Sequence, residues 1–135
     1  MDLTQNYPRS PKKTLVGLVH VPRMIDKARA LYKNCLGNYI FPCTLDKIIL
    51  EFLKIEAKEF VEHVNSDTVF DSWILNKCKT LTEDEKQYLN QKVLGKGPDT
   101  NEKRKNFIEL KNQISSTRED VKTWVDLIDL EEGRL

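Results

Sequence analysis

Apolar residues recur along this chain at intervals of three and four residues, and no window shows convincing apolar–polar alternation. Residues at these intervals share one face of an α-helix, whereas alternation would mark a half-buried strand. The spacing is clearest at Met24, Ala28, Leu31 and Cys35, and it returns in segments further along the chain. The stripes predict a chain built almost entirely of amphipathic helices.

Proline, glycine and capping residues delimit several of these helices. Pro22 and Gly37 bound the first strongly periodic segment, as expected for proline in a first turn and glycine just beyond a last one. Thr44 is expected to cap the next helix. Ser66 or Asp67 is expected to begin a later helix, because polar residues here precede a new apolar stripe.

Three pairs of residues have the spacing of a capping box. In this motif the side chain of the first residue and a carboxylate three residues later satisfy each other's backbone N–H groups. The pairs are Thr82 with Glu85, Asp99 with Glu102, and Ser116 with Glu119. Each pair predicts the start of a helix.

The segment before Pro22 admits two interpretations. Ser10 followed by Pro11 is typical of a helix start, and Gly17 would end the short helix that follows. The valine-rich stretch 15–21 instead favours a strand, but no second strand is evident to pair with it. We prefer the short helix over 10–17, followed by an extended link.

Length and composition agree with the helical pattern. The 135 residues fit one domain, since domains typically contain ~100–200 residues. With 39% hydrophobic and 32% charged residues, the composition is neither that of a disordered chain nor that of a membrane protein. We therefore expect an all-α fold, a single compact domain of six or seven short amphipathic helices over residues 1–135, with 1–9 as an irregular N-terminal segment.

The charge balance and the first residues argue against several classes of partner. The 22 Lys and Arg residues against 21 Asp and Glu leave a net charge of +1, too little for a broad field that would attract nucleic acid. No run of about 18 apolar residues is present to cross a membrane. The first residues lack the basic and apolar regions of a signal peptide. We expect a cytoplasmic protein with neither a nucleic-acid nor a membrane partner.

The cysteine and histidine spacings do not indicate a metal site. Cys35, Cys43 and Cys78 form no C-x-x-C pair, and His20 and His63 lie too far apart for a zinc-binding pair. We expect reduced thiols, no metal and no cofactor. Two of the thiols, Cys35 and Cys78, lie in apolar helical patterns and are expected to be small core residues.

Four segments together resemble a known family. They are residues 8–11 (PRSP), 20–30 (HVPRMIDKARA), 43–46 (CTLD) and 123–134 (TWVDLIDLEEGR). On these segments the chain resembles a family of small bacterial proteins catalogued as a domain of unknown function. The family pattern has Pro where this chain has Thr44, and either residue suits a helix start. The resemblance implies that the polar residues of these segments belong to the family pattern, and it implies no catalytic role for any of them.

Charged residues gather at the start of the 22–37 helix. Spacings of three and four let Asp26 share a surface with Arg29, and Arg23 with Lys27. One interpretation is a solvated face with an Asp26–Arg29 ion pair. In a second, Asp26 and Arg29 bridge helices and are partly buried. In a third, the cluster is a pocket for a small anion or carboxylate, with Arg23 as its bidentate donor.

A second group of polar residues surrounds the loop before the next helix. It contains Tyr39, Cys43 and Asp46. A helix N-terminus lowers the pKa of a nearby thiol, so Cys43 could act as a nucleophile with His20 as its base. A buried structural cysteine is the competing interpretation, and the helix dipole alone explains Asp46.

Four acidic residues lie near the C-terminus, at Asp126, Asp129, Glu131 and Glu132. Acids near a helix C-terminus are disfavoured by the helix dipole, and the spacing is not that of a calcium loop. Pairing with Arg9, Arg23 or Arg29 of the N-terminal segments would explain them.

Two hypotheses for function follow from these groups. The first is a non-catalytic helical module that binds a small ligand or a protein, and a homo-oligomer is compatible with it. Its candidate binding residues are His20, Arg23, Asp26, Lys27, Arg29, Tyr39, Cys43 and Asp46. The alternative is a small enzyme with a polar pocket around Arg23, Asp26, Cys43 and Asp46.

Overall fold

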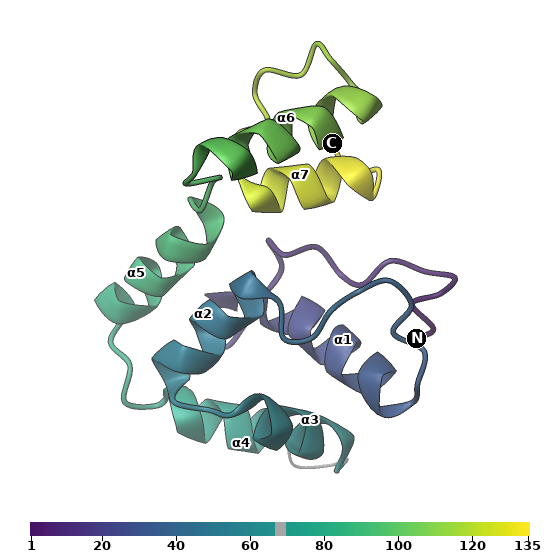
Figure 1. Cartoon of the computed structure of the whole chain (residues 1–135). Coiled ribbons are helices and arrows are strands. Elements are labelled where there is room, and N and C mark those ends of the chain that lie inside the picture. The colour runs from purple at the N-terminus through teal and green to yellow at the C-terminus, as the bar shows by residue number, and fades with distance from the viewer. Residues whose placement is uncertain (67–69) are drawn as a thin grey trace.

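The computed structural model describes residues 1–66 and 70–135 and confirms the all-α prediction. These residues form seven helices and one two-stranded hairpin (Figure 1). In chain order the elements are β1 (Thr14–Leu15), β2 (Leu18–Val19), α1 (Val21–Tyr32), α2 (Thr44–Leu53), α3 (Ala57–Asn65), α4 (Phe70–Cys78), α5 (Glu83–Leu94), α6 (Asn101–Ile114) and α7 (Trp124–Glu131).

The helix predicted over 10–17 is wrong, and a short antiparallel hairpin stands near its end. The backbone reverses at Val16 and Gly17, whose φ angles are 50° and 80°. Two consecutive residues at positive φ match the twist of paired strands. Leu18 is completely buried, and the Asn90 side chain of α5 bonds the backbone of both Gly17 and β2. The valine-rich stretch therefore finds its partner strand within the same few residues.

Helix α1 lies at the centre of the fold, and nine of its twelve residues are buried. It packs chiefly against α3. The predicted extension of this helix to Gly37 is wrong, because the chain leaves the helix after Tyr32 and Asn34 adopts φ 56°. Cys35 therefore lies half-buried in the chain after the helix rather than in the core, whereas Cys78 is buried as expected.

Aromatic rings gather in the larger of two hydrophobic cores. The centroid of the Phe60 ring of α3 lies 5.6 Å from that of Phe70, 5.8 Å from that of Phe41 and 6.4 Å from that of Trp73. A smaller core joins α6 to α7, where Phe107 meets Trp124 edge-on at 5.1 Å. These two helices lie side by side beyond α5, above the rest of the chain in Figure 1.

The predicted helix starts differ in outcome. Thr82 and Glu85 form the expected capping box at α5, with both hydrogen bonds at 3.1 Å. The other two predicted pairs are wrong. Thr100, rather than Asp99, is the N-cap of α6 and accepts the Lys103 N–H, and Ser116 and Glu119 lie in the connection between α6 and α7.

Two other predicted helix starts differ from the observed ones. Cys43, rather than Thr44, is the N-cap of α2, since Thr44 is already helical. Ser66 ends α3, and the alternative start at Asp67 lies outside the described residues. Helix α4 begins at Phe70 within the described chain.

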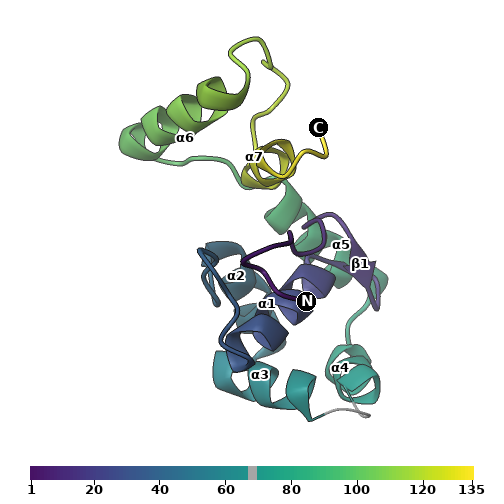
Figure 2. The same cartoon turned by 90° about the vertical axis from the view of Figure 1, so that its right-hand side faces the viewer.

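Segments near the two ends of the chain are hydrogen-bonded to each other, although the termini themselves lie apart in Figure 2. The Ser10 hydroxyl donates to the Asp129 carboxylate at 2.9 Å, and the Arg134 guanidinium donates to the Pro8 carbonyl at 2.6 Å. The residues joined in this way are more than one hundred positions apart in sequence. None of the described helices is long and apolar enough to cross a membrane.

Candidate functional site

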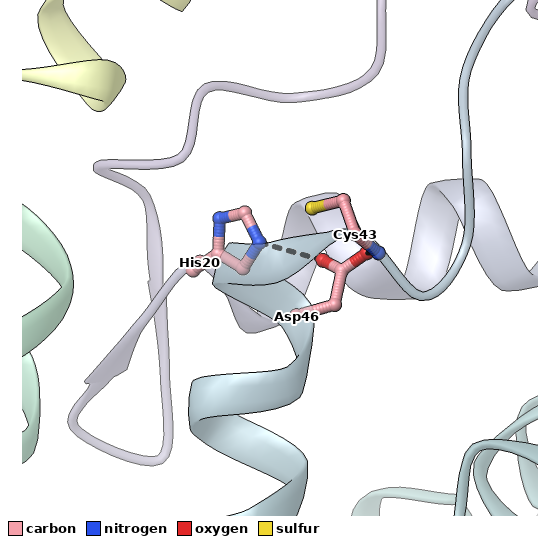
Figure 3. A group of neighbouring side chains, drawn as sticks. All are labelled: His20, Cys43 and Asp46. Atoms are coloured by element: carbon pink, nitrogen blue, oxygen red, sulfur yellow. Dashed lines mark hydrogen bonds and ion pairs between the residues drawn. The ribbon is translucent and has the colours of Figure 1, made fainter. Parts of the chain in front are cut away.

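A buried histidine–carboxylate pair stands between the hairpin and the start of α2. His20 and Asp46 are both completely buried, and His20 Nε2 lies 2.7 Å from Asp46 Oδ1 (Figure 3). Burial lowers the pKa of His20, so the ring is neutral and donates its Nε2–H to the carboxylate. Its other nitrogen, Nδ1, points away from Asp46 in Figure 3 and has no hydrogen-bond partner among the described residues.

Lys27 supplies the positive charge that makes a buried Asp46 tolerable. Its ammonium lies 2.7 Å from Asp46 Oδ2, and the same oxygen accepts the Cys43 backbone N–H at 2.8 Å. Burial alone would raise the pKa of Asp46, but the hydrogen bond from His20 and the charge of Lys27 outweigh it and lower that pKa to about 2. Asp46 is therefore an ionised structural anchor at neutral pH.

The Cys43 thiol is held beside this anchor. Its sulfur accepts from the Lys27 ammonium at 3.3 Å. Burial and the Asp46 charge raise the pKa of the thiol, although Lys27 opposes them. The helix N-terminus expected to activate this cysteine is present, but its effect is exceeded by that of burial, and the resting group is a neutral thiol.

His20, Cys43 and Asp46 also form a set of possible metal ligands, with donor atoms within 4.8 Å of one another. Imidazole, thiolate and carboxylate are donors that zinc accepts. However, the Lys27 ammonium already contacts Asp46 and Cys43. It occupies the place of a cation among these donors, so the set does not fit a metal ion while Lys27 is charged.

Arg23 forms a second buried pair, with the C-terminal end of α7. Its two terminal nitrogens donate to the two carboxylate oxygens of Glu132 at 2.9 and 2.8 Å. The Tyr39 hydroxyl donates to Glu132 at 2.9 Å, and the Tyr39 ring lies 5.4 Å from the Arg23 guanidinium carbon. Burial and the Glu132 charge raise the pKa of Tyr39 to about 12, so it stays a donor. The bidentate side of Arg23 is thus engaged by the protein itself.

The other two residues of the predicted cluster lie apart from these pairs. Asp26 is buried and accepts from the Arg9 backbone N–H at 2.8 Å and the Arg9 guanidinium at 3.1 Å. It therefore pairs with the N-terminal segment rather than with Arg29, which is exposed. Of the three interpretations of this face, the solvated one is wrong for Arg23, Asp26 and Lys27, all of which are buried.

Three of the four acidic residues near the C-terminus, Asp126, Asp129 and Glu132, pair with cations, and Glu131 does not within the described residues. Asp126 lies in the first turn of α7, where the helix dipole favours an acid, so the predicted unfavourable position is wrong for it. Glu132 binds Arg23, which confirms the prediction for that arginine. Asp126 instead binds Lys12 at 2.8 Å, a residue that the sequence argument did not single out. Asp129 also receives Arg134, the second residue that was missed, at 3.1 Å.

These pairs form one wall of a pocket of about 940 Å³ at the meeting of the chain ends. We call it the terminal pocket. It is lined by residues 3–7, the loop 37–40, and side chains from α1, α2's N-cap and α7. Five predicted residues line it, namely His20, Arg23, Lys27, Tyr39 and Cys43. Asp46 stands behind them, and Asp26 and Arg29 lie outside its lining.

Sequence reasoning missed the residues 3–7, which carry no helical stripe or motif. It did not include Glu131 and Glu132 among the candidate binding residues, although both line the pocket. The one available signal for the acidic residues was their position at a helix C-terminus.

Comparison with known proteins identifies a family for this chain but no activity. A family model described as "Domain of unknown function (DUF5069)" matches residues 5–134, which agrees with the resemblance on the four segments. No curated protein matches the chain. The match includes the whole terminal pocket except two lining residues, Leu3 and Thr4. Function therefore has to be argued from the pocket itself.

Proposed function

We propose that this chain, which belongs to the domain of unknown function family DUF5069, is a non-catalytic module that binds a small polar molecule in the terminal pocket. The observation that carries the proposal is the convergence of five polar or aromatic side chains from three separate segments on one pocket of about 940 Å³. That volume lies in the range of small-molecule sites, about 300–1,000 Å³.

The pocket wall is rigid and preorganised, which favours binding over mere packing. Arg23, Lys27 and His20 are each held by a charged or hydrogen-bonded partner, which is Glu132 for Arg23 and Asp46 for the other two. Groups held in this way lose little conformational entropy when a ligand arrives. Ile40 and Ile128 add apolar surface to the same lining, as is usual in small-molecule sites.

A small enzyme is the alternative, and the arrangement gives it less support. Of its four proposed residues, Asp26 and Asp46 are buried acids that do not line the pocket. Cys43 does line it, but burial raises the pKa of its thiol. A nucleophile needs a base in contact with it, whereas the hydrogen bond from His20 runs to Asp46.

The test uses a bulky side chain to fill the pocket without touching its buried pairs. Asn38 is an exposed lining residue, so Asn38→Trp should obstruct the site while the protein still folds. A library of polar fragments is screened by ¹H–¹⁵N NMR against the unmodified protein. Fragments that bind in the terminal pocket should shift the signals of residues 3–7 and 37–40, and Asn38→Trp should remove those shifts.

Asn112→Trp is the matched control, because Asn112 is exposed on α6 and outside the pocket lining. This variant should leave fragment binding unchanged. The proposal fails if no fragment perturbs the lining residues, or if both tryptophan variants behave alike.

We place the module in a bacterial cytoplasm, supported by the family resemblance and by three free cysteines among the described residues. Its partner would be a small molecule, neither nucleic acid nor a membrane, and the module functions as a monomer or a homo-oligomer. Gel filtration with light scattering determines which of these it is.

A further inference from the structure

The charges around the terminal pocket balance with one exception. Ion pairs join five cations to five acids, which are Arg9, Lys12, Arg23, Lys27 and Arg134 with Asp26, Asp46, Asp126, Asp129 and Glu132. His20 is neutral because burial lowers its pKa. Glu131 also lines the pocket, and no ion pair or hydrogen bond to its side chain is found within residues 1–66 and 70–135. The uncompensated charge in the pocket wall is therefore negative.

The position of Glu131 is unfavourable in the unliganded protein. It is the last residue of α7, where the helix dipole already adds negative potential. Although Glu131 is exposed, partial desolvation and the adjacent Glu132 raise its pKa, only partly offset by Arg23. Local rules are often broken at functional positions, and a cation beside Glu131 would offset the unfavourable charge interactions.

The hydrogen bonds of the wall also leave acceptors rather than donors without partners. In the wall formed by the buried pairs the donors are engaged, since Arg23 binds Glu132, Lys27 binds Asp46, and the Tyr39 hydroxyl binds Glu132. The groups of this wall without a partner among the described residues are acceptors, namely the Glu131 carboxylate at its exposed edge and the His20 Nδ1 atom buried beneath its surface. Elsewhere in the lining, Gln5, Tyr7 and Asn38 offer both donors and acceptors. A ligand that complements this wall must bring hydrogen-bond donors.

We propose that the terminal pocket binds a small organic cation, a primary amine or its equivalent, whose ammonium group pairs with Glu131. This inference rests on the proposed function and gives the ligand its class. The carboxylate supplies the charge recognition, and the tyrosine ring and the two isoleucines of the lining receive the carbon skeleton. An anion is disfavoured, because the nearby guanidinium and ammonium groups are already neutralised.

The experiment compares three probes with the same four-carbon skeleton and different charge. They are butylamine, which is a cation at neutral pH, butanoate and butanol. Each is titrated into the ¹⁵N-labelled full chain at low salt. Butylamine should shift the signals of the pocket lining at the lowest concentration, and raising the salt should weaken it.

Two variants of Glu131 test the pairing. Glu131→Gln keeps the shape and removes the charge, and it should weaken butylamine about fivefold, the effect of one partly exposed ion pair. Glu131→Lys should abolish butylamine binding. Glu119→Gln is the control, because Glu119 is an exposed acid in the connection between α6 and α7, and it should change nothing.

The outcomes separate this inference from the proposed function. If butanoate or butanol binds as tightly as butylamine, or Glu131→Gln leaves butylamine unaffected, the amine class is wrong and the pocket remains a binding site. If none of the three probes perturbs the lining, the amine class is again wrong, and the fragment screen with Asn38→Trp then decides the proposed function separately.

Discussion

Asp46→Asn should destabilise this protein strongly, although the substitution is nearly isosteric. The Asp46 carboxylate is completely buried and accepts three hydrogen bonds, from His20, Lys27 and the Cys43 backbone. Asparagine retains one oxygen and loses the charge. Lys27, with 4% of its side chain exposed, would then be a buried ammonium without a counter-charge.

Two routes give the magnitude. Breaking a buried ion pair by removing one partner typically costs about 3–5 kcal/mol. The pKa of Asp46 gives a lower figure, because a decrease from 3.8 to about 2 on folding corresponds to about 2.4 kcal/mol favouring the ionised carboxylate. We therefore expect the free energy of unfolding at pH 7 to fall by about 2–5 kcal/mol.

Urea unfolding followed by circular dichroism measures this loss, and a second variant isolates its cause. Asp46→Asn combined with Lys27→Met removes both charges, and such replacements of a buried pair are often near neutral. The double variant should be more stable than Asp46→Asn alone. Lys27→Met alone should be destabilised, because it leaves a buried carboxylate without its cation.

The pH dependence gives an independent check. The folded pKa of Asp46 lies below its unfolded value, so the stabilisation is complete above about pH 4 and is lost as the pH falls towards 2. The difference in unfolding free energy between the native chain and Asp46→Asn should shrink over that interval. A loss below about 1 kcal/mol at pH 7, or a double variant less stable than Asp46→Asn, would refute the reasoning.

Three further predictions concern the neighbouring groups. His20 should be neutral at pH 7 with its proton on Nε2, since burial lowers its pKa. Ring ¹⁵N shifts report the tautomer, and a ring charged at pH 7 would contradict this. Cys43 should react with iodoacetamide more slowly in the folded chain than in urea at pH 7.5, because burial raises its pKa, and mass spectrometry would reveal an equal or faster rate if this is wrong. Arg23→Lys should cost about 1–3 kcal/mol in urea unfolding by losing the bidentate contact with Glu132. Glu102→Gln, at an exposed acid in the first turn of α6, should change stability by no more than about 0.5 kcal/mol, and an equal loss in both variants would contradict the specific role of Arg23.

The features that the sequence predicted correctly depend on local interactions. Thr82 and Glu85 satisfy each other across three residues, so their spacing suffices to place the start of α5. The same spacing at Ser116 and Glu119 gave a wrong helix start. The spacing of two residues does not show whether the backbone after them is helical. The connection there instead runs to Thr123, which caps α7.

The features that were missed depend on residues far apart in the chain. The hairpin before α1 is tied down by Asn90, more than seventy residues away. Burial of Arg23 depends on Glu132 at the C-terminal end of α7, and burial of Lys27 depends on Asp46 in the first turn of α2. Periodicity assigns charged positions to the solvent side by default, and only tertiary contacts reverse that assignment.

The polar face of α1 links the fold to the proposed function. A central helix with a wholly apolar circumference would bury more hydrophobic surface, yet α1 carries Arg23, Asp26 and Lys27 inward. Replacing such pairs by apolar residues is often neutral for stability, so stability alone does not account for three of them on one helix. What these pairs add is position, because they join the chain ends to α1 and hold the donors of the terminal pocket engaged. With these donors engaged, Glu131 is the ionised side chain of the wall left to pair with a ligand, and this is the reason for proposing that the pocket favours a cation.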